Sequence, residues 1–316
     1  HLTVIGLVGD ESKVDFTHLA VLPGVKEARM IEAPYKLINR EYSSAYGETR
    51  THIIKIGDVE LGGDEPVVIA GPCAIEDRDS IFRIAEQVKE AGAQILRGGV
   101  FKPRSSVHSF QGLGSSGEEG AIEALTWLKE AGEKFGMPVV TEVRGEAQVD
   151  LVSKYVDIIQ IGSRNMYDQD LLQAAARKNL PIIFKRHFGA SIEEFLCFAE
   201  YIAAEGNKDI ILCERGIVPV GKGKNYTRYL LDLAAVPVVQ KETYLPIIVD
   251  PSHATGRRDL IRSMSLASIA AGASGLMIEV HDRPEEALCD ASQMISPAEL
   301  KEIIDLASQL RSITVK

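Results

Sequence analysis

Short apolar runs alternate with amphipathic stretches along most of the chain. The apolar runs are rich in β-branched residues and recur eight times, at 67–72, 93–99, 138–143, 157–163, 181–186, 209–215, 246–252 and 275–280. Between several of them, apolar residues recur at i, i+3, i+4 and i+7 with charged residues in between, as in 80–92, 120–136, 168–179 and 191–206. This pattern predicts strands that are buried on both faces and alternate with helices, which is typical of a parallel sheet.

The number of strand–helix units separates two α/β architectures. Eight units in about 250 residues match a (β/α)8 barrel, also called a TIM barrel. The alternative is a doubly wound open sheet, which usually has fewer strands and carries a Gly-x-Gly-x-x-Gly motif after the first strand. No such motif follows residues 67–72. We therefore predict the barrel.

The first 63 residues have a different pattern. Two strand-like segments, 2–10 and 25–33, flank a helix-like segment at 13–24, as in part of a small α+β module. Residues 51–63 read as a β-hairpin with a Gly-Asp turn, placed where it could cover the N-terminal end of the barrel. The predicted domain organisation is a partial regulatory domain at 1–33, a polar linker at 34–50, and a catalytic barrel with its hairpin at 51–316.

Composition narrows the classes of partner. The net charge is −10 at pH 7, which argues against nucleic acid or an anionic membrane as a partner. No apolar run approaches the roughly 20 residues of a membrane span, and the first residues do not resemble a signal peptide. The four cysteines show no Cys-x-x-Cys spacing. We therefore expect free thiols and a cytoplasmic location.

Chemically capable side chains follow every predicted barrel strand. In a TIM barrel the carboxyl ends of the strands meet at one mouth, where the active site lies. Because one charge after a strand is ordinary but eight at one mouth are not, we predict an active site there. The groups at these ends are Cys73, Arg97, Glu142, Arg164, Lys185 with Arg186, Glu214 with Arg215, Asp250 with His253, and Glu279 with His281.

Cations dominate one subset of these positions. Arginine offers a bidentate fork and lysine a point charge, so together they suit phosphorylated substrates. Ser105 and Ser106 add hydroxyl donors directly after Arg104. The members of the subset are Arg97, Lys102, Arg104, Arg164, Lys185, Arg186 and Arg215. They predict a basic mouth for one or two phosphate-bearing substrates.

A second subset has the composition of a metal site. Cys73, His253, Glu279 and Asp290 supply one sulfur, one imidazole and two carboxylates from neighbouring barrel strands. Such a mixed set suits Mn²⁺, Fe²⁺, Co²⁺ or Zn²⁺ better than Mg²⁺ or Ca²⁺. His281 is an alternative ligand or a supporting residue.

Nine motifs resemble one enzyme family in matching order. They are AGPCAIE (70–76), LRGGVFKPRSS (96–106), SFQGLG (109–114), TEV (141–143), QIGSRN (160–165), FKR (184–186), CERG (213–216), VDPSHATGRRD (249–259) and IEVH (278–281). Over about residues 50–316 the chain is similar to the type I β 3-deoxy-D-arabino-heptulosonate 7-phosphate (DAHP) synthases. The resemblance implies a TIM barrel that condenses phosphoenolpyruvate with erythrose 4-phosphate, releasing phosphate, in the first step of aromatic amino acid biosynthesis, the shikimate pathway.

The resemblance also implies residue roles. Its metal ligands are Cys73, His253, Glu279 and Asp290. By resemblance, phosphoenolpyruvate binds to Arg97, Lys102, Arg164, Lys185 and Arg215, and Asp250 is also among the substrate-binding residues. The sugar phosphate falls to Arg104 and Ser105, while Lys102, His253 and Glu142 move protons or position water.

Three alternatives stay open at this point. The octulosonate 8-phosphate synthases use arabinose 5-phosphate on the same barrel, but their basic loop usually reads Lys-Ala-Asn-Arg-Ser, whereas this chain has Lys-Pro-Arg-Ser at 102–105. A binding protein on an inactive barrel would not need every chemical position occupied. A metal-dependent aldolase that releases no phosphate would not need so many cations.

The resemblance extends to regulation and assembly. Some type I β enzymes carry a ferredoxin-like domain that binds Tyr or Phe, and residues 1–33 look like the later part of one. A feedback inhibitor at this domain and a homotetramer are therefore expected.

Overall fold

The strands of the computed structural model close into one parallel barrel. The structure describes residues 5, 7, 13–28, 33–41, 50–102, 108–221 and 224–314. The barrel strands are β3 (Val67–Gly71), β4 (Ile95–Arg97), β5 (Val139–Val143), β6 (Ile158–Ile161), β7 (Ile182–Lys185), β8 (Ile210–Glu214), β9 (Ile247–Val249) and β10 (Gly275–Glu279). Each strand pairs with the next along the chain, and β10 closes the barrel by pairing with β3 from Gly275–Val67 to Glu279–Gly71. All eight predicted strands are confirmed.

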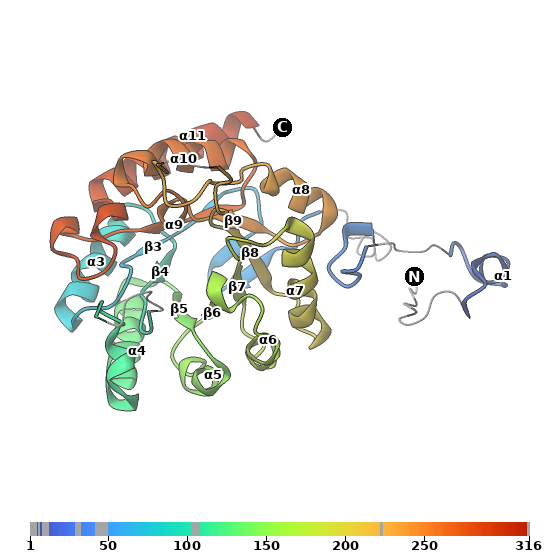
Figure 1. Ribbon diagram of the computed structural model, residues 1–316, viewed down its shortest axis with the longest axis horizontal. Helices are drawn as coiled ribbons and strands as arrows, with labels where there is room; N and C mark the ends of the chain where they lie inside the picture. Colours follow the sequence, from blue (N-terminus) through green and yellow to red (C-terminus); the bar gives the residue numbers. More distant parts are fainter. Residues whose placement is uncertain are drawn as a thin grey trace.

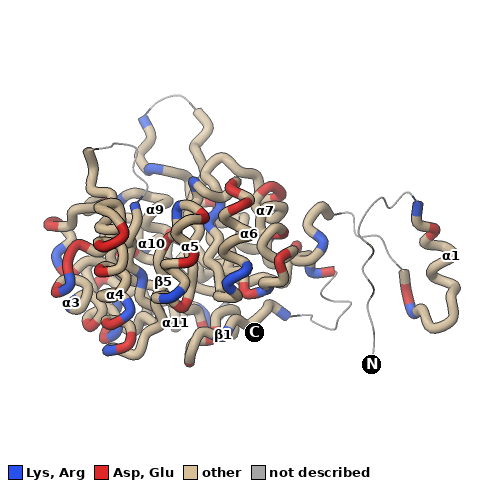
Figure 2. The backbone as a smooth tube through the Cα atoms, turned by 90° about the horizontal axis from the view of Figure 1, so that it is seen from below, with Lys and Arg blue, Asp and Glu red and all other residues tan. Residues whose placement is uncertain are grey.

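A ring of helices covers the barrel on the outside (Figure 1). The helices are α3 (Arg78–Glu90), α4 (Glu118–Phe135), α5 (Glu146–Val152), α6 (Gln169–Ala176), α7 (Ile192–Ala204), α8 (Ala235–Glu242), α10 (Arg258–Ala270) and α11 (Pro297–Thr314), with the short α9 (Pro251–Thr255) after β9. Acidic and basic residues are both spread over these outer helices (Figure 2). The four helices predicted from apolar spacing are confirmed.

Local signals set the helix ends. Asp77 caps α3 by accepting a hydrogen bond from the backbone N–H of Ser80. Ser191 and Glu194 form a reciprocal capping box at the start of α7. Helix α4 stops at Gly136, whose φ of 62° is the left-handed conformation that glycine adopts without steric cost.

The strand residues alternate between the inside of the barrel and the helix layer. On β7, Ile183 packs with the other inward side chains, whereas Ile182 and Phe184 pack toward the helices. Both environments are apolar, so the strands read as continuous apolar runs. The same alternation determines which residues at the strand ends face the mouth.

A hairpin lies against the inner residues of the barrel. Strands β1 (Ile54–Ile56) and β2 (Val59–Leu61) are antiparallel and joined by Gly57 and Asp58, with φ of 58° at Gly57. Ile54, Ile56 and Leu61 are buried in one cluster with inward residues from the starts of the barrel strands. The predicted hairpin is therefore present and covers the N-terminal end of the barrel.

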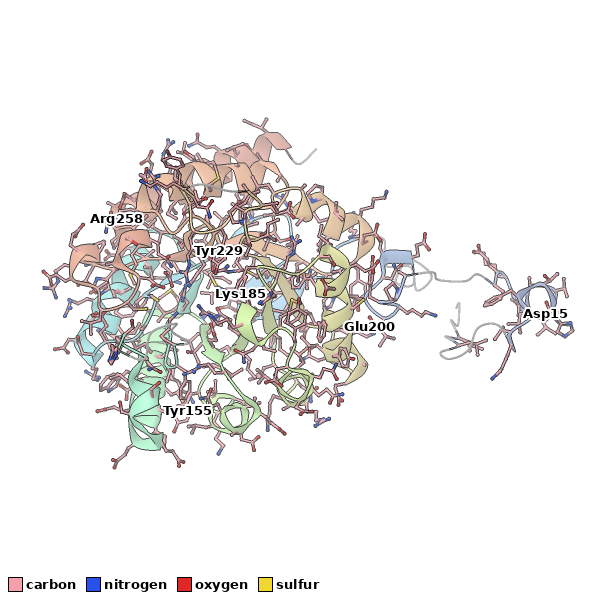
Figure 3. The ribbon with its side chains drawn as sticks, viewed as in Figure 1. Asp15, Tyr155, Lys185, Glu200, Tyr229 and Arg258 are labelled. Carbon is pink, nitrogen blue, oxygen red and sulfur yellow. The ribbon has the colours of Figure 1, made fainter. Side chains whose placement is uncertain are left out.

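The segment before the hairpin is fixed to the barrel wall at residues 33–41. The carboxylate of Glu200 on α7 accepts hydrogen bonds from the backbone N–H groups of Leu37 (2.7 Å) and Ile38 (3.2 Å), and Figure 3 shows Glu200 on the side of this segment. Tyr35 donates a 3.0 Å hydrogen bond to Glu242 on α8, and the Ile38 side chain is fully buried. The first half of the predicted linker therefore belongs structurally to the barrel.

The ferredoxin-like domain stays a prediction. Helix α1 (Phe16–Ala20) lies within the predicted helix at 13–24, and none of its residues is buried. Residues 25–28, which fall in the second predicted strand, are not in a strand. Most of the first predicted strand, 2–10, and residues 29–32 of the second lie outside the described residues. No helix within the described ranges has the length and hydropathy of a membrane span.

Candidate active site

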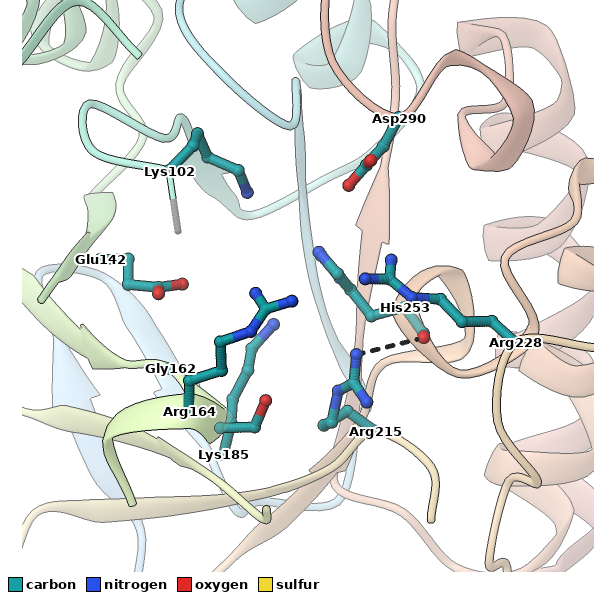
Figure 4. A pocket seen from close by; sticks show the side chains of 10 residues that line it. Lys102, Glu142, Gly162, Arg164, Lys185, Arg215, Arg228, His253 and Asp290 are labelled. Carbon is teal, nitrogen blue, oxygen red and sulfur yellow. Dashed lines mark hydrogen bonds between the residues drawn. The ribbon is translucent and has the colours of Figure 1, made fainter. Parts of the chain in front are cut away.

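The carboxyl ends of the strands surround one pocket (Figure 4). Side chains alternate between inward and outward positions along each strand. Five polar side chains at the strand ends point inward, because each lies two residues beyond a buried inward residue of its strand. They are Arg97, Glu142, Lys185, Asp250 and Glu279. The pocket is lined by Lys102, Glu142, Gly162, Ser163, Arg164, Lys185, Arg215, Arg228, His253 and Asp290. Residues on or after seven of the eight barrel strands, β4 to β10, thus share one opening.

Cations line one side of the pocket. Lys185 Nζ lies 2.5 Å from Asp250 Oδ2, and both side chains are almost fully buried. Arg215 donates from Nη2 to the backbone oxygen of His253 at 3.3 Å, and its guanidinium lies 4.3 Å above the Tyr229 ring. Arg164 is exposed at the rim. Two deep cations and one at the rim therefore face the same space.

Lys102 and Arg97 lie on the other side, next to acidic groups. Burial alone lowers the pKa of Lys102, but the nearby Cys73 and Glu279 raise it above its usual value, so the ammonium keeps its proton. Arg97 Nη1 lies 3.0 Å from Glu279 Oε1. Gly99 leaves room for the lysine, because a Cβ there would meet Cys73 O at 2.3 Å and Lys102 Cδ at 2.7 Å.

The predicted metal ligands form two overlapping groups. His253, Glu279 and Asp290 place one ligand atom each within 4.8 Å of one another, and so do Cys73, Cys289 and Asp290. Asp290 belongs to both groups. The predicted quartet is therefore gathered in one place, and Cys289 adds a second sulfur that the sequence prediction did not include.

The polar contacts at Glu279 fit a cation. Its Oε2 accepts a 2.6 Å hydrogen bond from Gln293. Its buried Oε1 accepts no hydrogen bond within the described part of the chain, with Arg97 Nη1 at 3.0 Å and His253 Nε2 at 3.3 Å. Burial would raise the pKa of Glu279, but His253, Arg97 and Lys102 lower it to about 2, so the group is a carboxylate at neutral pH. Sulfur, imidazole and carboxylate donors around one point are the ligand types of a borderline divalent metal.

Asp250 orients the imidazole of His253. Asp250 caps α9 by accepting from the His253 backbone N–H at 2.9 Å, and its Oδ2 lies 2.8 Å from His253 Nδ1. This contact leaves Nε2 pointing toward Glu279. Burial is the main cause of the lowered pKa of His253, which favours the neutral ring that a metal ligand needs.

Gln160 and Gly162 restrict the position of the Glu142 carboxylate. Gln160 donates a 2.6 Å hydrogen bond to Glu142 Oε2. A Cβ on Gly162 would meet Glu142 Oε1 at 2.2 Å. The carboxylate therefore lies directly on the glycine, at the wall of the pocket.

The structure places three of the sequence-based candidates outside the pocket lining and outside both metal groups. Asp250, expected to bind substrate, does not line the pocket: it is fully buried beneath Lys185 and His253. Arg186, proposed as a phosphate ligand, points into the helix layer, where it contacts Glu214 and Asp232 at 2.9 Å and the Ala190 backbone oxygen. His281 lies beside Glu76 and Asp282 and is in neither metal group. Arg104 and Ser105 lie outside the described residues.

Sequence reasoning missed four residues of the site. Arg228 lies in the long loop after β8, away from any strand end, so no signal marked it. Gln293 and Cys289 flank Asp290 in the loop after β10, and their closeness to a proposed ligand was a usable signal. Gln160 is two residues before Gly162 on β6, at an inward position that alternation could have identified.

Fold and site together define a class of protein: a (β/α)8 barrel with a basic pocket beside a mixed sulfur, nitrogen and oxygen ligand group at its mouth. The chain belongs to the DAHP synthetase I family, whose model matches residues 42–316. It is 45% identical over 308 residues to the phospho-2-dehydro-3-deoxyheptonate aldolase of Thermotoga maritima, covering 98% of this chain and 87% of the relative.

Two further matches, one solved structure and one relative of lower identity, add to this comparison. The crystal structure of the Thermotoga maritima aldolase, also called DAHP synthase, matches with a TM-score of 0.82 and 43% identity, covering 96% of this chain and 85% of that one. A 2-dehydro-3-deoxyphosphooctonate aldolase of Geotalea uraniireducens is 30% identical over 278 residues, covering 82% of this chain and 97% of the relative. The heptonate aldolase is thus the more similar of these two relatives.

Proposed function

We infer that this chain condenses phosphoenolpyruvate with erythrose 4-phosphate to give DAHP and inorganic phosphate, the first step of the shikimate pathway. The observation that carries the inference is the pocket, where Lys102, Lys185 and three arginines share one opening with His253 and Asp290. Two anionic substrates meeting at one mouth need this concentration of positive charge, on a chain whose net charge is −10. The higher identity to the heptonate aldolase than to the octonate aldolase supports the four-carbon sugar.

We assign phosphoenolpyruvate to the deep cations. Lys185 and Arg215, with Arg164 at the rim, bind its phosphate and carboxylate. Arg97 and Lys102 add positive charge on the side of the pocket where Glu279 lies. The guanidinium of Arg215 is held by the His253 backbone oxygen and the Tyr229 ring, so little rotamer entropy is lost on binding. Arg104 and Ser105 remain the proposed contacts of the sugar phosphate.

The metal ligands in this proposal are Cys73, His253, Glu279 and Asp290, for Mn²⁺, Co²⁺, Fe²⁺ or Zn²⁺. When bound, such a cation supplies Lewis-acid polarisation of the aldehyde oxygen of the sugar. The protein's part is to fix the ligand atoms: Gln293 holds Glu279 Oε2, and Asp250 holds His253 Nδ1.

The side chains around the pocket support the proton transfers. Carbon C3 of phosphoenolpyruvate bonds to the aldehyde carbon, the aldehyde oxygen takes up a proton, and positive charge develops at C2. Lys102, whose raised pKa keeps it protonated, is placed to donate that proton. Water adds at C2, positioned by Glu142 on its Gly162 wall, and the proton that it loses returns to Lys102. Loss of phosphate from the resulting hemiketal phosphate leaves the keto acid.

The test is phosphate release from phosphoenolpyruvate with each sugar, before and after EDTA. We expect turnover with erythrose 4-phosphate that chelation abolishes and Mn²⁺ restores. Turnover with arabinose 5-phosphate alone would establish the octulosonate reaction instead. Activity that resists EDTA would remove the metal from the mechanism.

Regulation and assembly are part of the same proposal. We propose that residues 1–33 belong to a ferredoxin-like domain that binds Tyr or Phe as feedback inhibitor, and that the enzyme is a homotetramer. The docking of residues 33–41 on α7 and α8 fixes the end of the segment that would join such a domain to the barrel. A cytoplasmic location is supported by the four cysteines, none of which forms a disulfide in the structure. Steady-state rates with millimolar Tyr or Phe and sedimentation velocity test these points.

A further inference from the structure

Cys289 lies inside the candidate metal site, although no step of the proposed reaction uses it. Its Sγ is 2.7 Å from Cys73 Sγ, and Cys73 Sγ is 3.5 Å from Asp290 Oδ2. Both cysteines are fully buried, in a small apolar cluster with Ala74 and Met294. A buried thiol in direct contact with a metal-ligand candidate is positioned to become a ligand itself.

The donor atoms divide into a soft and a hard set. The soft set has the two sulfurs of Cys73 and Cys289 with one oxygen of Asp290, and the hard set has His253 Nε2 with oxygens of Glu279 and Asp290. Thiolates select thiophilic cations such as Zn²⁺ and Cd²⁺, whereas the two carboxylates of the hard set suit Mn²⁺. Because Asp290 belongs to both sets, an ion bound to one set competes with an ion bound to the other.

The geometry needs a small adjustment to take an ion. At a Zn–S distance of about 2.3 Å and a tetrahedral angle, two sulfurs on one zinc stand about 3.8 Å apart. The sulfurs here must therefore separate by roughly 1 Å, which rotation of either cysteine side chain supplies. Separation to about 3.8 Å also lies within the 4.8 Å that encloses the three donor atoms.

We propose that Cys73, Cys289 and Asp290 form a second, thiophilic cation site that overlaps the mixed-ligand site and takes Zn²⁺ or Cd²⁺ in preference to Mn²⁺. Binding replaces the two thiol protons, which pass to the solvent, with two metal–sulfur bonds. The site depends on the ligand geometry and not on the reaction, so its test uses no substrate and is independent of the proposed function.

The first test is a titration of metal-free protein with Co²⁺ or Cd²⁺ under a phosphine reductant. Thiolate-to-metal charge transfer grows with the number of sulfur ligands. We expect Cys289→Ser to lose about half of the wild-type intensity per bound ion, Cys73→Ser to lose about half, and the double variant to lose nearly all. Cys197→Ser is the matched control, because Cys197 is a free thiol on α7 outside the site, and it should match wild type.

The second test is the affinity of the same variants for two metals. Cys289→Ser should weaken Cd²⁺ binding at least tenfold while changing Mn²⁺ binding less than twofold, with Mn²⁺ followed by the paramagnetic resonance of the free ion. Equal charge-transfer intensity per ion in wild type and Cys289→Ser would overturn the proposal. Equal weakening of Cd²⁺ and Mn²⁺ binding in Cys289→Ser would also overturn the proposal, because that result means a general structural effect. The Cys289→Ala variant is a check on the fold, and its near-ultraviolet circular dichroism is compared with that of wild type.

Discussion

The amide of Gln293 donates a 2.6 Å hydrogen bond to Glu279 Oε2, and both side chains are buried at the mouth of the barrel. Gln293 comes from the loop that also carries Asp290, so one loop supplies a metal-ligand candidate and the residue that orients another. Without this contact, Glu279 can rotate about its terminal torsion, and Oε1 no longer has a fixed position next to His253 Nε2.

Replacing Gln293 therefore weakens metal binding more than it weakens folding. We expect Gln293→Leu to lower Mn²⁺ affinity by roughly 10–100-fold, the usual effect of losing a residue that orients a ligand. Isothermal titration calorimetry measures the affinity. Gln240→Leu is the matched control, since its amide donates to the Gly272 backbone oxygen away from the site. Unchanged Mn²⁺ affinity in Gln293→Leu would show that this hydrogen bond does not orient a metal ligand.

A single methyl group at Gly162 should displace Glu142. The backbone of Gly162, with φ of −70°, suits any residue, but a Cβ would lie 2.2 Å from Glu142 Oε1. We expect Gly162→Ala to fold and to lose at least about tenfold in kcat, because a displaced base or water-positioning group is worth 10²–10⁴-fold. Gly145→Ala, where a Cβ meets nothing within 4 Å, should keep wild-type kcat. Normal kcat in Gly162→Ala would argue against any role for Glu142.

Asp250 should matter for stability through the buried charge of Lys185. Asp250→Asn leaves Lys185 Nζ buried without a carboxylate partner, and breaking a buried pair in this way costs about 3–5 kcal/mol. Adding Lys185→Met removes the unpaired charge, so the double variant should recover at least about 1 kcal/mol relative to the sum of the single effects. Urea unfolding of the four proteins gives the cycle. Strict additivity would mean that the two groups do not interact.

Arg164 and Arg186 should separate function from stability. Arg186→Met leaves Glu214 buried without its cation, in a position where burial already raises the pKa of that carboxyl, so we expect a loss of about 3 kcal/mol of stability. Arg164→Met, at the exposed rim of the pocket, should raise the KM for phosphoenolpyruvate with a stability change below about 0.5 kcal/mol. Denaturation curves and steady-state kinetics of both variants test this; the reverse pattern would assign Arg186 to the substrate.

The contact between Tyr35 and Glu242 predicts a transition at high pH. Burial, and then the hydrogen bond to Glu242, raise the pKa of Tyr35 from 10.0 to about 12. A folded-state pKa above the unfolded value contributes stability that is complete below pH 10 and disappears as the pH rises through about 12. The stability difference between wild type and Tyr35→Phe should shrink over this range. Parallel stability curves for the two proteins would show that Tyr35 does not titrate in this way.

The barrel was predictable from the sequence because its strands are buried on both faces. Continuous apolar runs such as 209–215 alternate with amphipathic helices, and only a parallel sheet covered by helices needs that pattern. Strand alternation also explains the error at Arg186. Ile183 and Lys185 point inward on β7, so the next residue after Lys185 must point into the helix layer.

Loop geometry was not predictable in the same way. The sequence named Asp290 as a ligand, but no signal indicated its left-handed φ of 53° or the sharing of its carboxylate by two ligand groups. Arg228 reaches the pocket because its backbone N–H donates to the Thr255 oxygen at the end of α9, a pairing between loops far apart in sequence. Such contacts depend on tertiary packing and not on periodicity.

The hairpin at the far end of the barrel has a consequence for the route that substrates and products take. Ile54, Ile56 and Leu61 cover that end, above an interior that the inward strand residues already fill. Lys185 lies buried below the exposed Arg164, so phosphoenolpyruvate, which we assign to both cations, has to pass the rim to reach the deeper one. The hairpin and the packed interior thereby make the described part of the barrel a one-ended site, which substrates enter and products leave at the mouth.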